Sequence, residues 1–297
     1  MENIKTAVAL GSFDGLHKGH KSVLACALSY GERGLVPCAL LFASHPLLSL
    51  TGSAPEEILQ PHIRSKMLAD MGVEEKRIDF ADVMNLTAEE FFESIILGKL
   101  NAGAVCCGEN FRFGKGGKGD VALLKELCEK AGVEITVAPT VSCNGEPVSS
   151  TRIRKAIKEG DIKSANEMLG YEFGYEAVVK TGYRRGRLMG APTINQYFDR
   201  GFIVPKNGVY ACKVNIYGKN YAGVANIGLR PSFENEDLRS ETCILGFDGD
   251  LYGEIIKVDL LEFLREEIKF PDIELLKEQI KKDAARAEEI FGGGNYV

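Results

Sequence analysis

The fold is decided at Leu10-Gly11-Ser12-Phe13-Asp14-Gly15-Leu16-His17-Lys18-Gly19-His20. Residues 5–10 form an apolar run that predicts a short buried strand, and residues 21–28 have helical spacing. The stretch therefore lies where a strand turns into a helix, which in an open α/β sheet is the usual ligand crevice. Its three glycines allow a sharp turn and the close approach of a ligand.

Two imidazoles give this turn its chemistry. His17 and His20 are three residues apart, which puts them on one face of the first helical turn. The free N–H groups of that turn favour an anion, so the pair suits charge stabilisation at a phosphate. An ordinary turn with incidental histidines is one alternative. A zinc site is another, although the stretch has no H-E-x-x-H helix and no nearby carboxylate pair.

The stretch resembles the H-x-G-H signature of the adenylyltransferase-type nucleotidyltransferases. Its longer form, G-x-F-D-G-x-H-x-G-H, is similar to the flavin branch of that superfamily.

Composition limits the class of protein. With 297 residues the chain is long enough for two domains, and its net charge of −6 without a basic tail argues against nucleic acid as a partner. The eight cysteines are scattered and form no C-x-x-C, which is typical of reduced cytosolic thiols. No secretion signal is recognisable, and the apolar run 35–43 is too short to span a bilayer. We expect a cytoplasmic protein without a membrane partner.

Alternating strand and helix patterns run to residue 170 and predict a parallel sheet covered on both faces, an α/β domain of Rossmann-like type. Short alternating runs broken by Gly, Asn and Asp follow, and they predict a small antiparallel β-barrel. Within it, residues 243–247 and 254–261 are expected to pair as a hairpin around Asp248-Gly249-Asp250. Asp272 is expected to cap a C-terminal helix. The expected domains are 1–170 and 171–297.

Three further stretches belong to the first domain. Ser44-His45-Pro46 ends the second predicted strand, and Asn110-Phe111-Arg112-Phe113-Gly114 follows the strand that ends at Cys107. Ser149-Ser150-Thr151-Arg152-Ile153-Arg154 places hydroxyls and guanidinium groups at a helix N-terminus, a combination that can bind a polyphosphate.

All four stretches, in this order, resemble the bacterial bifunctional riboflavin kinase/FMN adenylyltransferase (FAD synthetase) family. The resemblance implies that His17 and His20 are catalytic and stabilise the α-phosphate of ATP while the phosphate of FMN attacks it. It implies an ATP site made of Gly11, Ser12, Phe13, Asp14, His17, His20, Ser150, Thr151 and Arg154. It implies a flavin site made of His45, Asn110, Phe111 and Arg112. The family usually has P-H-P at Ser44-His45-Pro46 and Asp at Asn110.

The barrel region carries a second dense stretch, Gly182-Tyr183-Arg184-Arg185-Gly186-Arg187-Leu188-Met189-Gly190-Ala191-Pro192-Thr193-Ile194-Asn195. Its glycines and arginines can approach and neutralise a polyphosphate. Thr193 and Asn195 face the same way on extended backbone and offer oxygen ligands suited to Mg²⁺. A basic surface loop is the alternative. The stretch resembles the G-x-x-R-G-x-x-x-G-x-P-T-x-N signature of riboflavin kinases, which implies ATP contacts at Gly182, Arg187, Gly190, Thr193 and Asn195.

Later segments match the same family in order. Asn226-Ile227-Gly228-Leu229-Arg230-Pro231-Ser232 resembles its N-I-G-x-R-P-T segment, and Glu241-Thr242-Cys243-Ile244 resembles the segment with the catalytic Glu, although His is usual at Cys243. The resemblance implies that Glu241 takes the proton of the riboflavin 5′-hydroxyl. It implies that Arg265 lies at the flavin or phosphate pocket.

These observations together predict a bifunctional enzyme that uses ATP and Mg²⁺ to convert riboflavin to FMN and FMN to FAD. A flavin-responsive binding protein and a transferase for another mononucleotide are the alternatives. The sequence gives no oligomeric state.

Overall fold

The computed structural model describes residues 4–43, 46–180, 193–231 and 236–294. The chain divides into two compact units, residues 1–150 and 151–297, and each is described by itself. The expected boundary at residue 170 differs from this division by two helices, α7 (Ser150–Glu159) and α8 (Ile162–Leu169). As a statement about independent folding, the boundary at 170 stays a prediction.

The first unit contains a five-stranded parallel sheet in the order β3-β2-β1-β4-β5. Its strands are β1 (Thr6–Leu10), β2 (Val36–Phe42), β3 (Glu74–Ile78), β4 (Ala102–Gly108) and β5 (Glu134–Ala138). The strand order reverses at β1, which pairs in parallel with both β2 and β4. The predicted parallel sheet is confirmed, and its switch point lies at the carboxyl ends of β1 and β4, where ligands of such folds bind.

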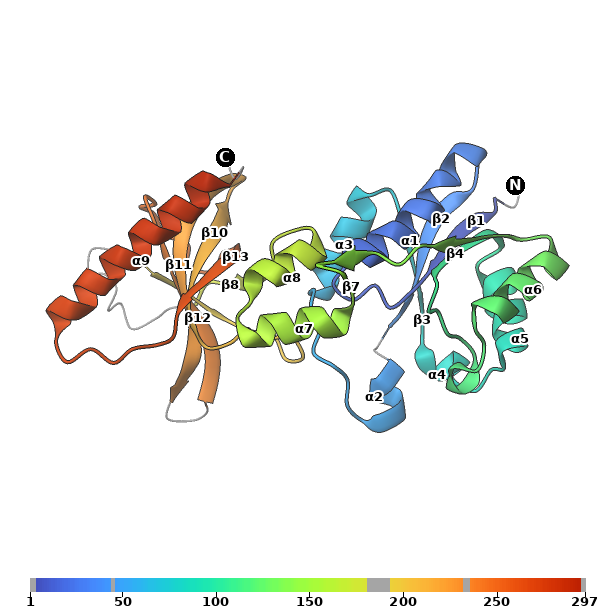
Figure 1. Cartoon of the computed structure of the whole chain (residues 1–297), viewed down its shortest axis with the longest axis horizontal. Helices are drawn as coiled ribbons and strands as arrows, with labels where there is room; N and C mark the ends of the chain where they lie inside the picture. The colour runs from blue at the N-terminus through green and yellow to red at the C-terminus, as the bar shows by residue number, and fades with distance from the viewer. Residues whose placement is uncertain (1–3, 44–45, 181–192, 232–235, 295–297) are drawn as a thin grey trace. The chain divides into compact units, whose positions relative to one another are not determined.

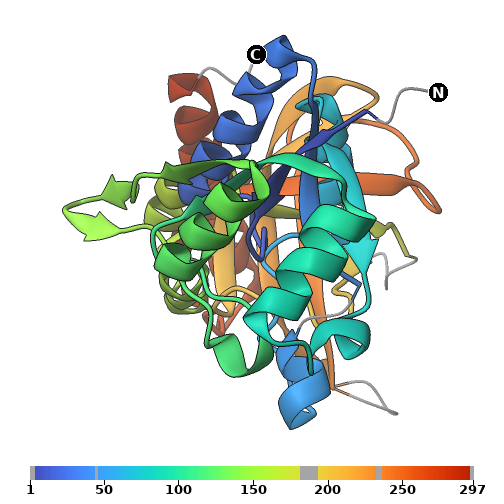
Figure 2. The ribbon, with the colours of Figure 1, turned by 90° about the vertical axis from the view of Figure 1, so that its right-hand side faces the viewer.

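Helices follow the strands, as the alternating pattern predicts. The α-helices are α1 (Lys18–Ser29), α2 (Pro46–Thr51), α3 (Pro61–Asp70), α4 (Phe80–Val83), α5 (Ala88–Phe91) and α6 (Val121–Ala131). Short 3-10 turns are η1 (Gly31–Arg33) and η3 (Lys115–Gly117), and η2 (Phe92–Lys99) continues α5 as a π-helix. The two-residue strands β6 (Ser142–Cys143) and β7 (Glu146–Pro147) form a hairpin that projects from the unit in Figure 2.

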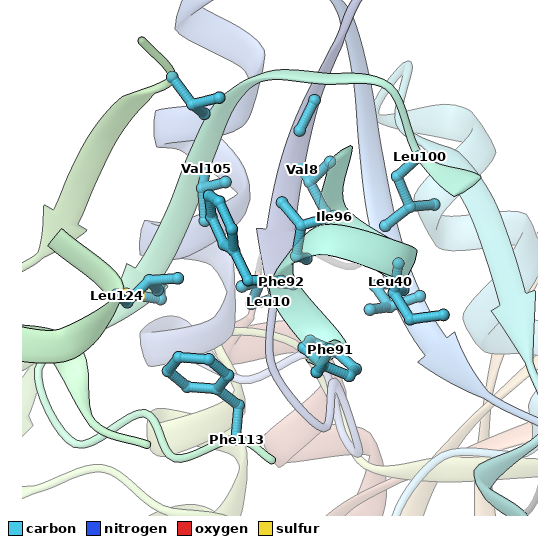
Figure 3. Packing of buried hydrophobic residues seen from close by; sticks show 14 of the residues in the cluster. Val8, Leu10, Leu40, Phe91, Phe92, Ile96, Leu100, Val105, Phe113 and Leu124 are labelled. Carbon is cyan, nitrogen blue, oxygen red and sulfur yellow. The ribbon is translucent and has the colours of Figure 1, made fainter. Parts of the chain in front are cut away.

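The core of the first unit lies between the sheet and these helices. In Figure 3, apolar side chains from β1, β2 and β4 meet those of α5, η2 and α6. Val8, Val105, Ile96 and Leu124 are fully buried. Strand β3 was not predicted from the sequence because its residues, Glu-Glu-Lys-Arg-Ile, are mostly charged. It forms one edge of the sheet, where charged residues protect against further pairing.

The second unit contains a six-stranded antiparallel sheet in the order β8-β13-β10-β11-β12-β9. Figure 1 shows this sheet with the C-terminal helix of the chain beside it. Its strands are β8 (Gly174–Val178), β9 (Thr193–Tyr197), β10 (Gly208–Ile216), β11 (Lys219–Pro231), β12 (Glu236–Ile244) and β13 (Ile255–Arg265). The sheet curls so that its two edges approach each other: Lys180 bridges Asn195, and the amide of Gln196 donates to the carbonyl of Ala177 at 2.8 Å. The predicted barrel is confirmed as a nearly closed one.

One expected pairing in the barrel is wrong. The segments 243–247 and 254–261 do not form a hairpin, because β12 pairs with β11 and β9 whereas β13 pairs with β10 and β8. The turn residues Asp248-Gly249-Asp250 occur in a connection between strands that are not neighbours. Turn-forming residues indicate that the chain changes direction. Which strands then pair depends on how the whole sheet closes.

Helices complete the second unit. The C-terminal helix α9 (Ile273–Gly293) begins as predicted, with the Asp272 side chain accepting from the backbone N–H of Leu275 at 2.9 Å. Its residues Ala287 and Phe291 join an apolar cluster with Ala211 and Leu261 of the barrel. Helix α8 also lies against the barrel, since Asn166 donates to the carbonyl of Leu260 at 2.9 Å.

Candidate functional site

The turn after β1 holds two stacked imidazole rings. His17 is the N-cap of α1, and its Nδ1 accepts from the backbone N–H of His20 at 3.2 Å. The ring centroids are 3.7 Å apart with an interplanar angle of 14°. A Cβ on Gly19 would lie 3.2 Å from the His17 ring, so glycine leaves room for this arrangement.

The backbone of the same turn is strained. Phe13 and Leu16 have positive φ values of 50° and 36°, which residues with side chains rarely adopt. Both side chains are fully buried, which holds the turn in this conformation. Two contacts anchor it further: the carboxylate of Asp14 accepts from the N–H of Ile58 at 3.0 Å, and Ser150 donates to the carbonyl of Asp14 at 3.1 Å. Strain of this kind is concentrated at functional sites.

Burial keeps both imidazoles neutral. It lowers the pKa of His17 from 6.5 to about 4. Burial, with an added contribution from His17, lowers the pKa of His20 well below 6.5. Because Nδ1 of His17 accepts a hydrogen bond, the proton of the neutral ring is on Nε2. The pair can therefore donate hydrogen bonds at neutral pH without carrying a charge.

A pocket of about 640 Å³ opens at this turn. Nine of the residues that the sequence predicts for the ATP and flavin sites line it: Gly11, Ser12, Asp14, His17, His20, Asn110, Phe111, Arg112 and Ser150. Phe13 is not in the wall but contacts the His20 ring at a centroid distance of 5.4 Å. Thr151 and Arg154 follow Ser150 in the first turn of α7, which the division of the chain assigns to the second unit. His45 lies outside the described residues.

The second unit brings another set of predicted residues together. Asn195 on β9 pairs directly with Glu241 on β12, which in turn pairs with Asn226 on β11. Thr193, two residues before Asn195, donates from its hydroxyl to the Glu241 carboxylate at 3.1 Å. Three adjacent strands thus present amide, carboxylate and hydroxyl groups side by side. Gly182, Arg187 and Gly190 lie outside the described residues.

A second pocket, of about 550 Å³, is next to this row. Asn226 lines it, and the amide oxygen of Asn226 is buried without a hydrogen-bond partner among the described residues. Arg265 also lines the pocket, and its guanidinium is held by the buried carboxylate of Asp283 on α9 at 2.7 Å and 3.1 Å. Gln279 donates to the same carboxylate at 2.9 Å. Asn226 therefore links the Glu241 row to the pocket that Arg265 lines.

Comparison with known proteins agrees with this two-part arrangement. The family model described as FAD synthetase matches residues 1–152, and the riboflavin kinase model matches residues 169–291. A bifunctional riboflavin kinase/FMN adenylyltransferase of Bacillus subtilis is 34% identical over 98% of this chain and 94% of its own length. The Escherichia coli protein of the same name is 35% identical over 96% and 92%.

The chain belongs to the bifunctional riboflavin kinase/FMN adenylyltransferase family. The first pocket lies in its FAD synthetase region, and the Glu241 row lies in its riboflavin kinase region. A solved structure from Streptococcus pneumoniae, described as that of a macrolide-efflux protein, is 32% identical, with a TM-score of 0.89 over 97% of this chain and 95% of that one. The fold class predicted from the sequence is confirmed by these matches.

The first pocket, which lies in the region matched by the FAD synthetase model, also has a charged part that the sequence did not predict. Glu57, Arg64, Arg77 and Glu109 also line it. Arg77 is in β3, the strand that was not recognised, and its neighbour Ile78 ends that strand. Arg64 lies in α3, where no motif marked it. Charged residues near the carboxyl ends of the predicted strands include Glu109, which follows β4, but neither Arg77, whose strand was not predicted, nor Arg64.

No cluster of three or more His, Cys, Asp or Glu side chains that could hold a metal ion occurs among the described residues. No described helix is long and apolar enough to cross a membrane.

Proposed function

We propose that this chain carries out the two reactions of its family at separate sites. At the second unit's site, the γ-phosphoryl group of ATP is transferred to the 5′-hydroxyl of riboflavin, which gives FMN. In the first pocket, the phosphate of FMN attacks the α-phosphate of ATP, the bond to the leaving pyrophosphate breaks, and FAD forms. The observation that supports this proposal most directly is the stacked, neutral pair of His17 and His20 in the first pocket.

For adenylyl transfer, the histidines act as preorganised hydrogen-bond donors. The Nε2–H of His17 and the His20 ring would donate to oxygens of the α-phosphate as negative charge builds up in the transition state. Neutral rings lose little by being buried, so the donors are in place before the substrate arrives. Gly11, Ser12 and Asp14 would contact ATP from the same turn. The buried Phe13 would support the turn through its contact with the His20 ring. Ser150, Thr151 and Arg154 would bind the β- and γ-phosphates at the start of α7.

The flavin of this reaction would bind toward the segment after β4. Asn110, Phe111 and Arg112 line the same pocket as the histidines. Phe111 stacks on Phe113 at 5.8 Å with an interplanar angle of 11°, which fixes an aromatic surface at the pocket wall. His45 stays a prediction for this site.

For riboflavin phosphorylation, Glu241 would orient the 5′-hydroxyl and accept its proton. Thr193, Asn195 and Glu241 offer hydroxyl, amide and carboxylate oxygens, a set that fits Mg²⁺. A Mg²⁺ ion carried with ATP would be held by Thr193 and Asn195 and would neutralise charge on the phosphates. Gly182, Arg187 and Gly190 would contact the ATP phosphates, and the pocket lined by Asn226 and Arg265 would hold the isoalloxazine ring.

The cellular setting follows from chemistry and composition. None of the eight cysteines, all of which lie in the described ranges, forms a disulfide, which is compatible with the reducing cytoplasm that we propose. The net charge of −6 supports small-molecule partners, namely riboflavin, FMN, FAD and ATP, rather than nucleic acid.

The direct test is incubation of the protein with riboflavin, ATP and Mg²⁺, followed by chromatography of the flavins over time. We expect FMN to appear first and FAD to follow. Formation of neither product would refute the proposal and favour a flavin-binding protein. Formation of FMN alone would refute the assignment of the first pocket.

A further inference from the structure

One wall of the first pocket has no role in the proposed mechanism. It consists of Glu57, Pro61 and Arg64 from the segment that enters α3, with Arg77 of β3 beside them. Asp14 fixes this wall to the histidine turn, since its carboxylate accepts from the N–H of Ile58. A Cβ on Gly15 would lie 3.1 Å from the Ile58 side chain, so the two segments are in close contact. The segment that carries this wall is therefore in direct contact with the histidine turn.

Arg64 differs from the other arginines of this pocket in its partners. Arg77 is ion-paired with Glu75 and donates to the hydroxyl of Ser65 at 3.0 Å. Arg112 is 3.6 Å from the carboxylate of Asp120. The Nε of Arg64, in contrast, is buried and has no hydrogen-bond partner in the described part of the chain.

The carboxylates near Arg64 do not neutralise it by contact. Burial raises the pKa of Glu57, and the positive charge of Arg64 opposes that rise. The two groups therefore interact electrostatically. Within the described ranges, however, Arg64 forms no ion pair with Glu57 or with Glu75. A buried donor without a partner is unfavourable, and an oxygen anion entering the pocket would relieve that cost by accepting a hydrogen bond from it.

The reaction proposed for this pocket brings two phosphates together. FMN carries a phosphate monoester, and the α-phosphate of ATP that it attacks is also negative. His17 and His20 are neutral and cannot offset this repulsion by charge. Arg154 is assigned to the leaving pyrophosphate. A separate cation is needed on the acceptor side, and the planar fork of an arginine binds a phosphate through two parallel hydrogen bonds.

We propose that Arg64 binds the 5′-phosphate of FMN and thereby selects FMN over riboflavin as the acceptor in the first pocket. The inference rests on the adenylyltransferase function proposed for this pocket. With this contact, the first pocket accepts a flavin only after the flavin has been phosphorylated. That order, phosphorylation before adenylyl transfer, is the one that the two reactions require.

The test combines a change in the protein with a change in the ligand. Arg64→Gln should raise the KM for FMN in FAD formation by about tenfold to a hundredfold, which is the range for losing hydrogen bonds to a charged group. The inhibition constant of 5′-deoxyriboflavin, which has the flavin ring but can neither be phosphorylated nor present a phosphate, should change less than twofold. Arg64→Lys should recover part of the loss because it keeps the charge without the fork.

Two controls make the outcome decisive. Arg77→Gln removes the same charge from the same pocket, but from a side chain already held by Glu75 and Ser65, and should leave the KM for FMN within about threefold. The kcat for FAD formation at saturating FMN, which should stay within about threefold of normal, reports whether the first unit of Arg64→Gln is folded. An unchanged KM for FMN, or equal changes for FMN and 5′-deoxyriboflavin, would overturn the role of Arg64. Absence of FAD formation by the unaltered protein would instead overturn the function of the pocket.

Discussion

In the first unit the candidate catalytic side chains follow the ends of strands, whereas in the second unit they lie on the strands themselves. His17 and His20 are positioned by a helix cap, two buried residues with positive φ, and a glycine that makes room for a ring. Asn195, Glu241 and Asn226 are positioned by the pairing register of three strands. A site in a turn is thus recognisable as a local motif, while a site on a sheet exists only once distant strands have paired.

The contrast between the two units can be tested first by separating them. A fragment of residues 151–297 should be more stable than one of residues 171–297, although both contain the described kinase residues. Removing α7 and α8 strips Ile162, Met168 and Leu169, all at most 3% exposed, from the unit. At about 1.5–3 kcal/mol for each large apolar side chain, the loss is on the order of 5 kcal/mol. Urea denaturation of both fragments measures it, and equal midpoints would show that the boundary at 170 is the better one.

The strand-borne site is tested next, through its carboxylate. Glu241→Gln keeps the shape and removes the proton acceptor, so FMN formation should fall by roughly a hundredfold or more. Conversion of supplied FMN to FAD should stay within about twofold of normal, since that chemistry is assigned to the other unit. The two products are assayed separately on the purified variant. Near-normal FMN formation would remove Glu241 from the role of base.

The turn-borne site should respond in the opposite way. His17→Ala and His20→Ala should each lower FAD formation by roughly tenfold to a thousandfold, the range around the loss of one transition-state donor. Riboflavin phosphorylation should persist in both variants. Similar losses in both reactions would indicate unfolding rather than a role in adenylyl transfer.

A smaller effect is expected at the pocket that Arg265 lines. Asp283→Asn weakens the paired hydrogen bonds that hold the Arg265 guanidinium, so the KM for riboflavin should rise by about tenfold with kcat changed less than threefold. Glu289→Gln is the matched control, because Glu289 lies on the same helix and pairs with the half-exposed Arg286. A fall in kcat at unchanged KM would place Asp283 outside substrate positioning.

The last test concerns pH and stability. The folded-state pKa of His17 is about 4 and its ordinary value is 6.5, so the unfolded chain binds more protons between these values. Stability should therefore decrease as pH falls from about 6.5 to 4, by at most about 3 kcal/mol for this group. His17→Gln should reduce that slope. Denaturation midpoints between pH 7 and 4.5 check this, and identical slopes in the variant and the unaltered protein would contradict it.

Features that depend on neighbours along the chain could be predicted from the sequence. Helix starts at Asp120 and Asp272, the buried runs of β1 and β4, and the histidine turn all follow from local capping, periodicity and glycine content. The family resemblance rested on the same local motifs. It also pointed to Glu241, although no residue close to Glu241 in the sequence explains its role.

The other features became visible only in the folded chain, because they depend on residues that are distant in sequence. Closure of the barrel pairs β12 with β9 and β11 instead of β13, and so sets Asn226 opposite Glu241. The charged strand β3 is held by pairing with β2. The lowered pKa of His17 and the unpartnered Nε of Arg64 both result from desolvation by surrounding segments, a sum over the whole environment that no local pattern contains.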